Sequence, residues 1–420
     1  MEHQEEYEEL ERQLEEDRRI YKKGLRKGIC LTLVVVLLLT AAGSIVLRRN
    51  GFVFTSFAFD KKLTGEVLSE PVQKKVAEIL SALSAYYYED IPTEKLPDGM
   101  YAGMVDSLGD RYTTYFTAEE YKEYISGSNG TYYGIGAVLT QDRKTGVISI
   151  SRVYEGSPAE KAGLLKGDIF ISADGVAAEG IDITEFVTHV KGDKGTKVKL
   201  VMERDGKKKT FTVIRDEVEV PTVEHQMLKN HTGYISILEF DKVTADQFRT
   251  ALKDLKKQKM TSLIVDLRDN PGGMVSSVTE ILDEILPKGL LVYTQDKNGK
   301  KTEYKSDSNE LGMPLAVLVN ENSASSSEIF AGAIKDYEYG TLIGTKTFGK
   351  GIVQVLLPLS DGSAIKVTTA KYFTPKGNYI HEVGIEPDVK LEYKQQKKEY
   401  DINKDNQVKK ALEILKKESR

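Results

Sequence analysis

Residues 315–328 read LAVLVNENSASSSE, and this stretch decides the class of fold. Leu315 to Val319 is a short apolar run of the kind that forms a buried strand, and a helix is predicted from Glu328 to Lys335. A buried strand that turns directly into a helix is typical of crossover units on a parallel sheet. The serine-rich turn between them therefore lies at the end of a strand, where α/β proteins bind their ligands.

The same alternation of strands and helices continues on both sides of this turn. The predicted strands are Gly233–Ile237, Leu263–Leu267, Leu315–Val319 and Thr341–Gly344. The predicted helices are Thr244–Lys257, Val275–Leu286, Glu328–Lys335 and, as an amphipathic tail, Asp405–Lys417. We therefore predict a mixed sheet-and-helix core over residues 218–390, followed by a helical tail over residues 391–420.

Two further segments precede this core and indicate an α+β or α/β protein of several domains. Residues 60–129 carry helical patterns at Glu70–Tyr88 and Met100–Leu108, and Thr117 is a candidate N-cap for a third helix. We interpret this segment as a helical cap or a dimer arm. From residue 130 to 217 the pattern changes to short strands and glycine turns, which predicts a separate β-rich domain inserted before the core.

The N-terminus carries a candidate membrane segment. Ile29 to Leu47 holds no charged residue, and at about 1.5 Å per residue in a helix it just spans an apolar layer of about 30 Å. Basic residues are more numerous before it than after it, which predicts that residues 1–28 are cytoplasmic and that the rest lies outside the cell. A cleaved signal peptide is the alternative, but its apolar region usually runs only about 7–15 residues. We therefore predict an uncleaved, single-pass anchor in the cell membrane.

Composition excludes several classes of partner and site. The 420 residues carry a formal net charge of −5, so no basic excess points to nucleic acid. Cys30 is the only cysteine, which excludes an internal disulfide and a cysteine-based zinc site. None of the histidines forms a close pair, so a histidine metal centre is not expected. We expect no cofactor, although Mg²⁺ or Ca²⁺ bound by carboxylates alone stays open.

Three short motifs suggest chemistry, and each also has a purely structural interpretation. Ser325 precedes a predicted helix whose free N–H groups suit an oxyanion, but with Glu328 it also forms the S-x-x-E pattern of a capping box. Gly272 and Gly273 follow a strand and would let backbone amides approach a substrate, yet two glycines also make a simple turn. Lys350 stands between glycines in a predicted tight loop, and loop lysines are usually solvated.

Taken in chain order, these motifs resemble those of the carboxyl-terminal processing peptidases, the S41-type serine proteases that contain a PDZ domain. The likeness covers nearly all of the chain beyond the anchor. It rests on the blocks Tyr101–Tyr112, Ser157–Leu164, Gly167–Ile169, Asp266–Gly273, Asn322–Glu328, Thr347–Gln354, Ala370–Pro375 and Gly384–Val389. The resemblance implies a nucleophile at Ser325, a general base at Lys350 and a supporting Gln354.

The resemblance also implies an oxyanion hole made of two backbone donors. One is the N–H of Ser326, and the other is the N–H of Gly272 or Gly273. The choice between the two glycines stays open at this point.

A lysine base must be uncharged, which requires a special environment. With a reference pKa of about 10.4, only about one lysine in 2,500 is neutral at pH 7. Burial away from carboxylates lowers this pKa, so we predict that Lys350 is desolvated and that Gln354 orients its amine without adding charge. His381 and His231 are the rival bases, but neither has a matching acid in the sequence.

Residues 130–217 resemble a PDZ domain, which holds the terminal carboxylate of a peptide with backbone amides. The candidate carboxylate loop is Gly134-Ile135-Gly136-Ala137, in which Ile135 is expected to line an apolar pocket. Helix Ile183–Val190 would form the other wall of the groove. A hairpin bend with structural glycines is the alternative interpretation. In some relatives an arginine couples peptide binding to activation, but Lys191 stands at that position and lacks the bidentate fork of arginine.

The resemblance therefore implies a membrane-anchored serine endopeptidase that cleaves extracytoplasmic proteins recruited through exposed, apolar C-terminal residues. The alternative from another class is a catalytically silent, membrane-tethered PDZ scaffold that binds C-terminal peptides. An acyl-transfer enzyme is a third interpretation, but no adenine-nucleotide fingerprint supports it. The expected partners are protein or peptide substrates, the membrane through the N-terminal helix, and a second copy of the chain through its helical segments.

Overall fold

The computed structural model describes residues 60–307, 309–396 and 400–418. The chain divides into two compact units, residues 1–94 and 95–420, and this division falls within the segment predicted as one helical cap. The predicted anchor, Ile29–Leu47, lies outside the described residues. None of the helices in the described ranges has both the length and the apolar character that a membrane crossing requires.

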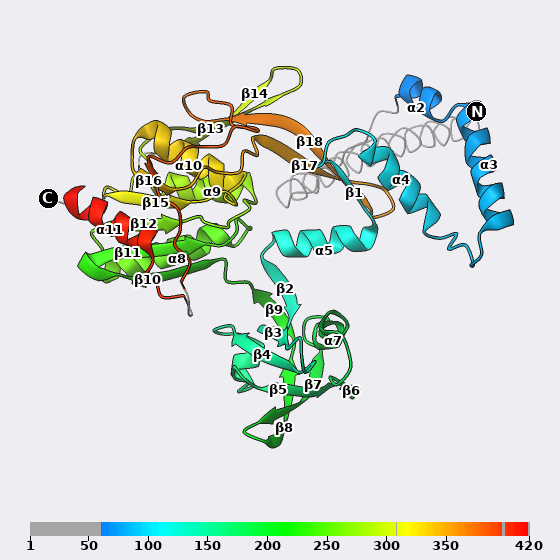
Figure 1. Ribbon diagram of the computed structural model, residues 1–420, viewed down its shortest axis with the longest axis horizontal. Helices are drawn as coiled ribbons and strands as arrows, with labels where there is room; N and C mark the ends of the chain where they lie inside the picture. The colour runs from blue at the N-terminus through cyan, green and yellow to red at the C-terminus, as the bar shows by residue number, and fades with distance from the viewer. Residues whose placement is uncertain (1–59, 308, 397–399, 419–420) are drawn as a thin grey trace, which may run out of the picture. The chain divides into compact units, whose positions relative to one another are not determined.

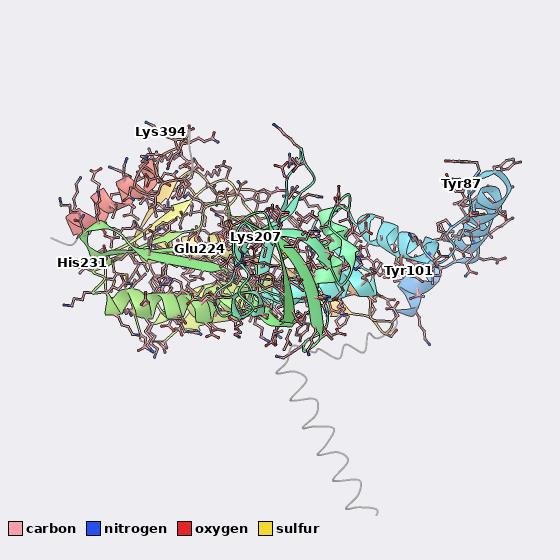
Figure 2. All side chains as sticks on the ribbon, turned by 90° about the horizontal axis from the view of Figure 1, so that it is seen from below. Tyr87, Tyr101, Lys207, Glu224, His231 and Lys394 are labelled. Atoms are coloured by element: carbon pink, nitrogen blue, oxygen red, sulfur yellow. The ribbon has the colours of Figure 1, made fainter. Side chains whose placement is uncertain are left out.

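The first unit, in its described part, contains α2 (Lys61–Val67) and α3 (Glu70–Tyr86). α3 is the first predicted helix, but it ends at Tyr86 because Tyr87 is extended, with φ −71° and ψ 133°. Within this described part, neither helix buries a residue. The apolar side chains of Ile79 and Leu80 are exposed, as is Tyr87, which is labelled in Figure 2.

The second unit contains the predicted core, whose main sheet has the strand order β10-β11-β12-β15-β16-β19. Neighbours from β11 to β19 are parallel, and β10 pairs antiparallel with β11 at the edge. The strands are β10 (Val223–Met227), β11 (Thr232–Ile237), β12 (Ser262–Asp266), β15 (Leu315–Val319), β16 (Thr341–Gly344) and β19 (Val389–Lys390). Every residue of β12 and β15 is buried, as expected for parallel strands covered on both faces. The predicted parallel core is thereby confirmed.

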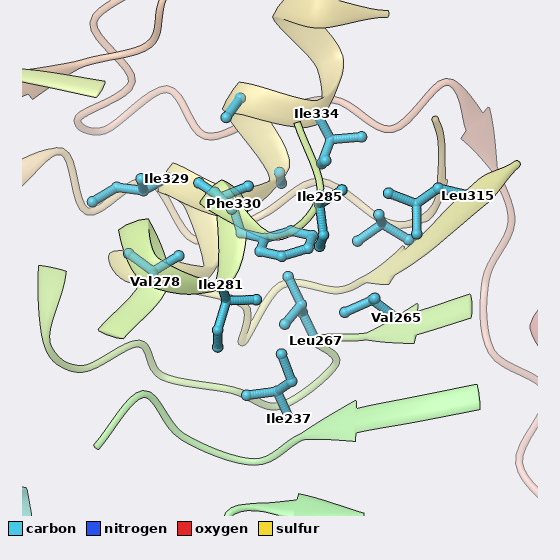
Figure 3. Close-up of a cluster of buried hydrophobic side chains, with 14 of the residues drawn as sticks. Ile237, Val265, Leu267, Val278, Ile281, Ile285, Leu315, Ile329, Phe330 and Ile334 are labelled. Atoms are coloured by element: carbon cyan, nitrogen blue, oxygen red, sulfur yellow. The ribbon is translucent and has the colours of Figure 1, made fainter. Parts of the chain in front are cut away.

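Helices pack on both faces of this sheet (Figure 1). On one face lie α8 (Thr244–Lys257), α9 (Val275–Asp283) and α10 (Ser326–Tyr337), whose Ile281 and Phe330 join Val265 of β12 in a buried cluster (Figure 3). On the other face lies α11 (Asn406–Glu418), whose Val408 packs in a cluster with Ile264. Because successive residues of a strand point to opposite faces, neighbours in β12 serve two different clusters.

A second, antiparallel sheet, which the sequence analysis does not predict, has the order β1-β18-β13-β14, with β17 also paired to β18. Its strands are β1 (Thr114–Phe116), β13 (Gly289–Asp296), β14 (Lys301–Ser306), β17 (Ile352–Pro358) and β18 (Ala364–Phe373). β1 lies between α4 (Leu96–Asp106) and α5 (Ala118–Ser128), and Thr117 accepts from Glu120 N at 3.3 Å as the predicted N-cap. Part of the predicted cap therefore belongs to this sheet.

The β-rich domain has its own buried core, to which Phe170 and Phe186 belong. Its sheet has the order β3-β4-β5-β7-β8, with β6 on β5. The elements are β3 (Ala137–Gln141), β4 (Ile148–Val153), α6 (Pro158–Lys161), β5 (Ile169–Ala173), β6 (Val176–Ala177), α7 (Ile183–Val190), β7 (Lys197–Arg204) and β8 (Lys207–Ile214). The two ends of this domain, one following α5 and the other leading to β10, pair as a ribbon of β2 (Thr131–Gly134) and β9 (Asp216–Glu219).

A buried ion cluster ties the C-terminal tail to the end of β12. Arg268 donates from Nε to Asp266 Oδ1 and from a terminal nitrogen to Asp405 Oδ2, both at 2.9 Å, and Tyr234 Oη donates to Asp266 at 2.7 Å.

Replacing the fully buried Asp405 with alanine should lower the free energy of unfolding by about 3 kcal/mol, because the buried guanidinium of Arg268 loses a charged acceptor. We expect a lower urea midpoint for this variant. Glu413→Ala, which removes two exposed ion pairs, is the control, and equal midpoints for the two variants would contradict the prediction.

Candidate active site

The serine-rich turn leads from β15 into α10 and presents Ser325 immediately before the helix. Ser325 has φ 53° and ψ −112°, a strained backbone conformation for a residue with a side chain. The surroundings hold it there: Tyr372 Oη donates to Ser325 O, and Ala324 N donates to Asn270 O, each at 3.0 Å. Backbone strain that the structure maintains in this way is common at active sites.

The other serines of this turn use their hydroxyls in structural hydrogen bonds. Ser323 Oγ donates to Leu267 O at 2.7 Å, Ser326 Oγ to Gly273 O at 2.8 Å and Ser327 Oγ to Asn270 O at 2.9 Å. These bonds fasten the turn to the segment that follows β12. The geometry therefore favours Ser325 over its neighbours as the candidate nucleophile.

The carboxylate of Glu328 joins the loop of the candidate nucleophile to the loop of the candidate base. It is fully buried and accepts from Thr347 Oγ1 at 2.6 Å and from Gly349 N at 2.7 Å. One oxygen, Oε2, accepts from both Lys350 N at 2.8 Å and Ser325 N at 3.0 Å. Burial raises the pKa of Glu328, while these hydrogen bonds favour its charged form. The predicted capping residue thus also brings the two loops together.

The electrostatic surroundings of Lys350 favour a neutral amine. Burial lowers the pKa of Lys350, and the nearby cations Lys366 and Arg111 lower it further. Asp110 and Glu328 oppose this effect, and the pKa remains below its ordinary value. The sequence prediction of a desolvated lysine agrees with this direction, but the expectation that carboxylates would be absent nearby is wrong.

Two residues near Lys350, Arg111 and Tyr112, are not predicted from sequence as part of the site. Tyr112 lies with its ring centroid 4.8 Å from Lys350 Nζ, and Arg111 lies with Cζ 4.7 Å from the same centroid. Both belong to a block that we interpret from sequence as part of the helical cap. The signal that marks them is the motif itself, Gly109-Asp110-Arg111-Tyr112, which contains charged and aromatic residues but no helical apolar pattern.

The Gly-Gly turn lies directly against the N-terminus of α10. A side chain at Gly272 would place its Cβ 2.7 Å from Ser325 Cβ and 2.9 Å from Ser326 N, and the residue has φ 107°. Glycine is therefore required at this position. The N–H of Gly272 donates to Asn270 Oδ1 at 2.8 Å, so it is already engaged, and this favours Gly273 as the second candidate oxyanion donor.

Gln354 lies on β17, a few residues beyond the candidate base. Its Nε2 donates to Thr368 Oγ1 of β18 at 3.4 Å. Within the described residues no hydrogen bond joins Gln354 to Lys350, so its role as a supporting residue stays a prediction.

The two rival histidines occupy different places. His381 lies beside the base loop, the loop from residue 345 to 351 that carries Lys350. Its Nδ1 accepts from Gly351 N at 3.3 Å, and its ring is 6.4 Å from that of Tyr112. His231, labelled in Figure 2, directly precedes β11. It is therefore at the amino end of a parallel strand, whereas the serine turn and the Gly-Gly turn follow the carboxyl ends of β15 and β12. Only His381 comes close to the site.

The candidate carboxylate loop of the β-rich domain joins β2 to β3. Gly136 has φ 77° and needs glycine, because a Cβ there would meet Ser157 Cβ at 2.3 Å. The Ile135 side chain is 2% exposed and packs in the domain core, with Ile135 O accepting from Ala159 N at 2.7 Å, and its place beside an apolar peptide pocket stays a prediction. Lys191, at the end of α7, lies with Nζ 5.6 Å from the centroid of the Tyr132 ring.

Comparison with known proteins places this arrangement in a family. Residues 231–391 match the family model described as peptidase family S41, and residues 149–204 match a PDZ domain. A "probable CtpA-like serine protease" of Staphylococcus aureus is 33% identical over 356 residues, which cover 83% of this chain and 71% of that protein. The chain belongs to peptidase family S41. The PDZ domain predicted from sequence is likewise present in this S41 chain.

Further relatives of this S41 chain carry the same description. A "probable CtpA-like serine protease" of Staphylococcus epidermidis is 38% identical over 322 residues, which cover 76% of the chain. The chain spans 65% of the length of that relative. Among solved structures, the photosystem II D1 C-terminal processing protease is 29% identical, with a TM-score of 0.45, over 76% of this chain and 86% of that protein.

Proposed function

We propose that this S41 chain is a serine endopeptidase in which Ser325 attacks the peptide carbonyl and Lys350 acts as general base. The observation that carries the proposal is the buried carboxylate of Glu328, which accepts from the backbone N–H of both residues. A structural cap of α10 would need only the bond to Ser325. The additional bonds from Thr347, Gly349 and Lys350 support an arrangement that positions both the proposed nucleophile and the proposed base.

The reaction follows from the roles of these groups. As Ser325 Oγ bonds to the carbonyl carbon, its proton passes to Lys350 Nζ, and the oxyanion accepts from Ser326 N and Gly273 N. The Lys350 ammonium then gives its proton to the leaving amine, and an acyl-enzyme remains. A water molecule attacks this ester while Lys350 takes its proton; as the bond to Ser325 Oγ breaks, Lys350 returns that proton to Oγ, which releases the acid product and restores both groups. Gln354 supports the lysine without adding charge.

The PDZ domain provides the recognition part of the proposal. We infer that its carboxylate loop and α7 bind exposed, apolar C-terminal residues of protein substrates. We also infer from the sequence that Ile29–Leu47 anchors the chain in the cell membrane, that the catalytic part is extracytoplasmic, and that two copies associate through the helical segments. The rival function is a catalytically silent scaffold with the same PDZ ligands.

Active-site labelling separates the peptidase from the scaffold. The full-length chain is treated with a fluorophosphonate, which reacts with activated serines, and the adduct is mapped by mass spectrometry. We expect a single adduct on Ser325, together with cleavage of an unfolded test protein. Ser276→Ala, at an exposed serine of α9 that takes no part in the proposed mechanism, should be labelled like the wild type. An adduct on another serine would contradict the assignment, and the absence of both labelling and cleavage would favour the scaffold.

A further inference from the structure

The segment that leads into β1 is built into the sheet that carries the base loop. β1 pairs antiparallel with β18, and Thr114 lies opposite Lys366 in this register. Just before the strand, Thr113 Oγ1 donates to Asp110 Oδ2 at 2.7 Å and accepts from Thr368 N at 3.1 Å. Because Thr113 is buried, these bonds fix the position of the two residues between it and Asp110.

Those two residues, Arg111 and Tyr112, contact the base loop at two points. Lys350 Nζ is 4.8 Å from the centroid of the Tyr112 ring, within the range of a cation–π contact. Arg111 Cζ is 4.7 Å from the same centroid and 5.6 Å from that of Phe348, which belongs to the base loop. Arg111 also donates a hydrogen bond to Tyr112 Oη. Lys350 and Arg111 thus both lie against the ring of Tyr112.

Other charged groups face the same amine. Lys366 of β18 is held with Nζ 5.4 Å from the ring of Phe116 and 5.2 Å from that of Tyr124. The carboxylates of Asp110 and Glu328 carry the opposite charge, and both act on Lys350. The ring of His381 also lies nearby, with its centroid 6.4 Å from that of Tyr112. The balance of charge at the base is therefore set by groups from β18, α10 and the segment before β1.

We propose that Arg111 and Tyr112 are positioning residues of the active site. Tyr112 holds the amine of Lys350 in place, and Arg111 keeps a permanent positive charge near that amine. This inference rests on the proposed Ser325–Lys350 chemistry. Arginine stays protonated at every relevant pH, so its charge disfavours protonation of the Lys350 amine without competing for the proton. The face of the tyrosine ring holds the amine and stabilises the ammonium that forms when Ser325 gives up its proton.

The pH dependence of Ser325 labelling tests the role of Arg111. Below the pKa of Lys350 the amine is protonated and the reaction slows. Removing a neighbouring cation raises that pKa, so the acid limb of the profile should move to higher pH. For Arg111→Gln we expect a shift of about 0.5–1 pH unit, and so a labelling rate about 3- to 10-fold lower on the acid limb. Arg111 is exposed, so the variant should fold.

Two variants control for loss of structure. Arg111→Lys keeps the charge and should restore most of the wild-type profile, whereas Arg143→Gln removes an exposed arginine in the β3–β4 turn and should leave the profile unchanged. If Arg111→Gln has the wild-type acid limb while Ser325→Ala and Lys350→Ala are inactive, this inference is wrong and the proposed function stands. If Lys350→Ala is itself fully active, the proposed function is wrong.

Steady-state kinetics with a peptide substrate test the role of Tyr112. Tyr112→Phe keeps the ring and should retain kcat within about 3-fold, whereas Tyr112→Leu should lower kcat by at least about 10-fold with little change in KM. A substrate-binding role would instead raise KM in both variants and would overturn the assignment of Tyr112.

Discussion

Replacement of Lys350 with arginine should lower kcat/KM for an unfolded protein substrate by at least about 10³-fold at pH 7, because arginine keeps its proton and cannot accept one from Ser325. Lys350→Ala should lose a similar amount. The side chain itself makes no hydrogen bond to the Glu328 carboxylate, which is bound by the Lys350 backbone N–H, so either variant keeps this link between the loops.

The matched control is Lys346→Arg, which lies in the same loop and keeps an exposed ion pair with Glu386. We expect this variant to cleave at the wild-type rate. Initial cleavage rates are measured from pH 6 to pH 9. If a variant only had a base with a raised pKa, its activity would recover at high pH. Full activity of Lys350→Arg at pH 7 would exclude Lys350 as the base and direct attention to His381, which accepts from Gly351 N nearby.

Ser325→Ala should lower kcat by about 10⁴- to 10⁶-fold, because the covalent route is lost and only the oxyanion donors and substrate binding remain. The fold should survive, since the turn is held by the hydroxyls of Ser323, Ser326 and Ser327. Isothermal titration with a peptide that has an apolar C-terminus should give the wild-type Kd. Retained cleavage in Ser325→Ala, with Ser276→Ala as control, would remove the nucleophile assignment and with it the proposed mechanism.

The local parts of the core were predictable, because each is encoded within a few neighbouring residues. α8, β15 and β16 begin and end where the apolar patterns predict, and α9 ends at Asp283, before the predicted Leu286. The second sheet was not predictable, because its pairings join distant segments, as in the bond from Thr368 N to Thr113 Oγ1 across 255 residues. No local periodicity encodes such a partner.

The same reason divides the candidate site into predictable and unpredictable parts. Ser325 and Lys350 could be proposed because their short motifs, taken in chain order with the others, resemble those of the S41 family. The positions of Arg111 and Tyr112 depend on β1 joining β18, so their contacts with the base could not be read from sequence. Glu328 was predicted only as a helix cap, because its other partners lie about twenty residues further along the chain.

The bonds of Glu328 have a consequence for how the proposed peptidase activity could be switched off. A single carboxylate oxygen accepts from the backbone N–H groups of positions 325 and 350, so it couples the loop of Ser325 to the loop of Lys350. Withdrawing the lysine alone would strip a buried anion of its donors, at a cost of several kcal/mol. A reversible resting state is cheaper to reach by displacing the segment before β1, which carries Arg111 and Tyr112 and lies outside this carboxylate network. Inhibitors designed to lock the protein in an inactive form should therefore target the edge of β18 where β1 pairs with it.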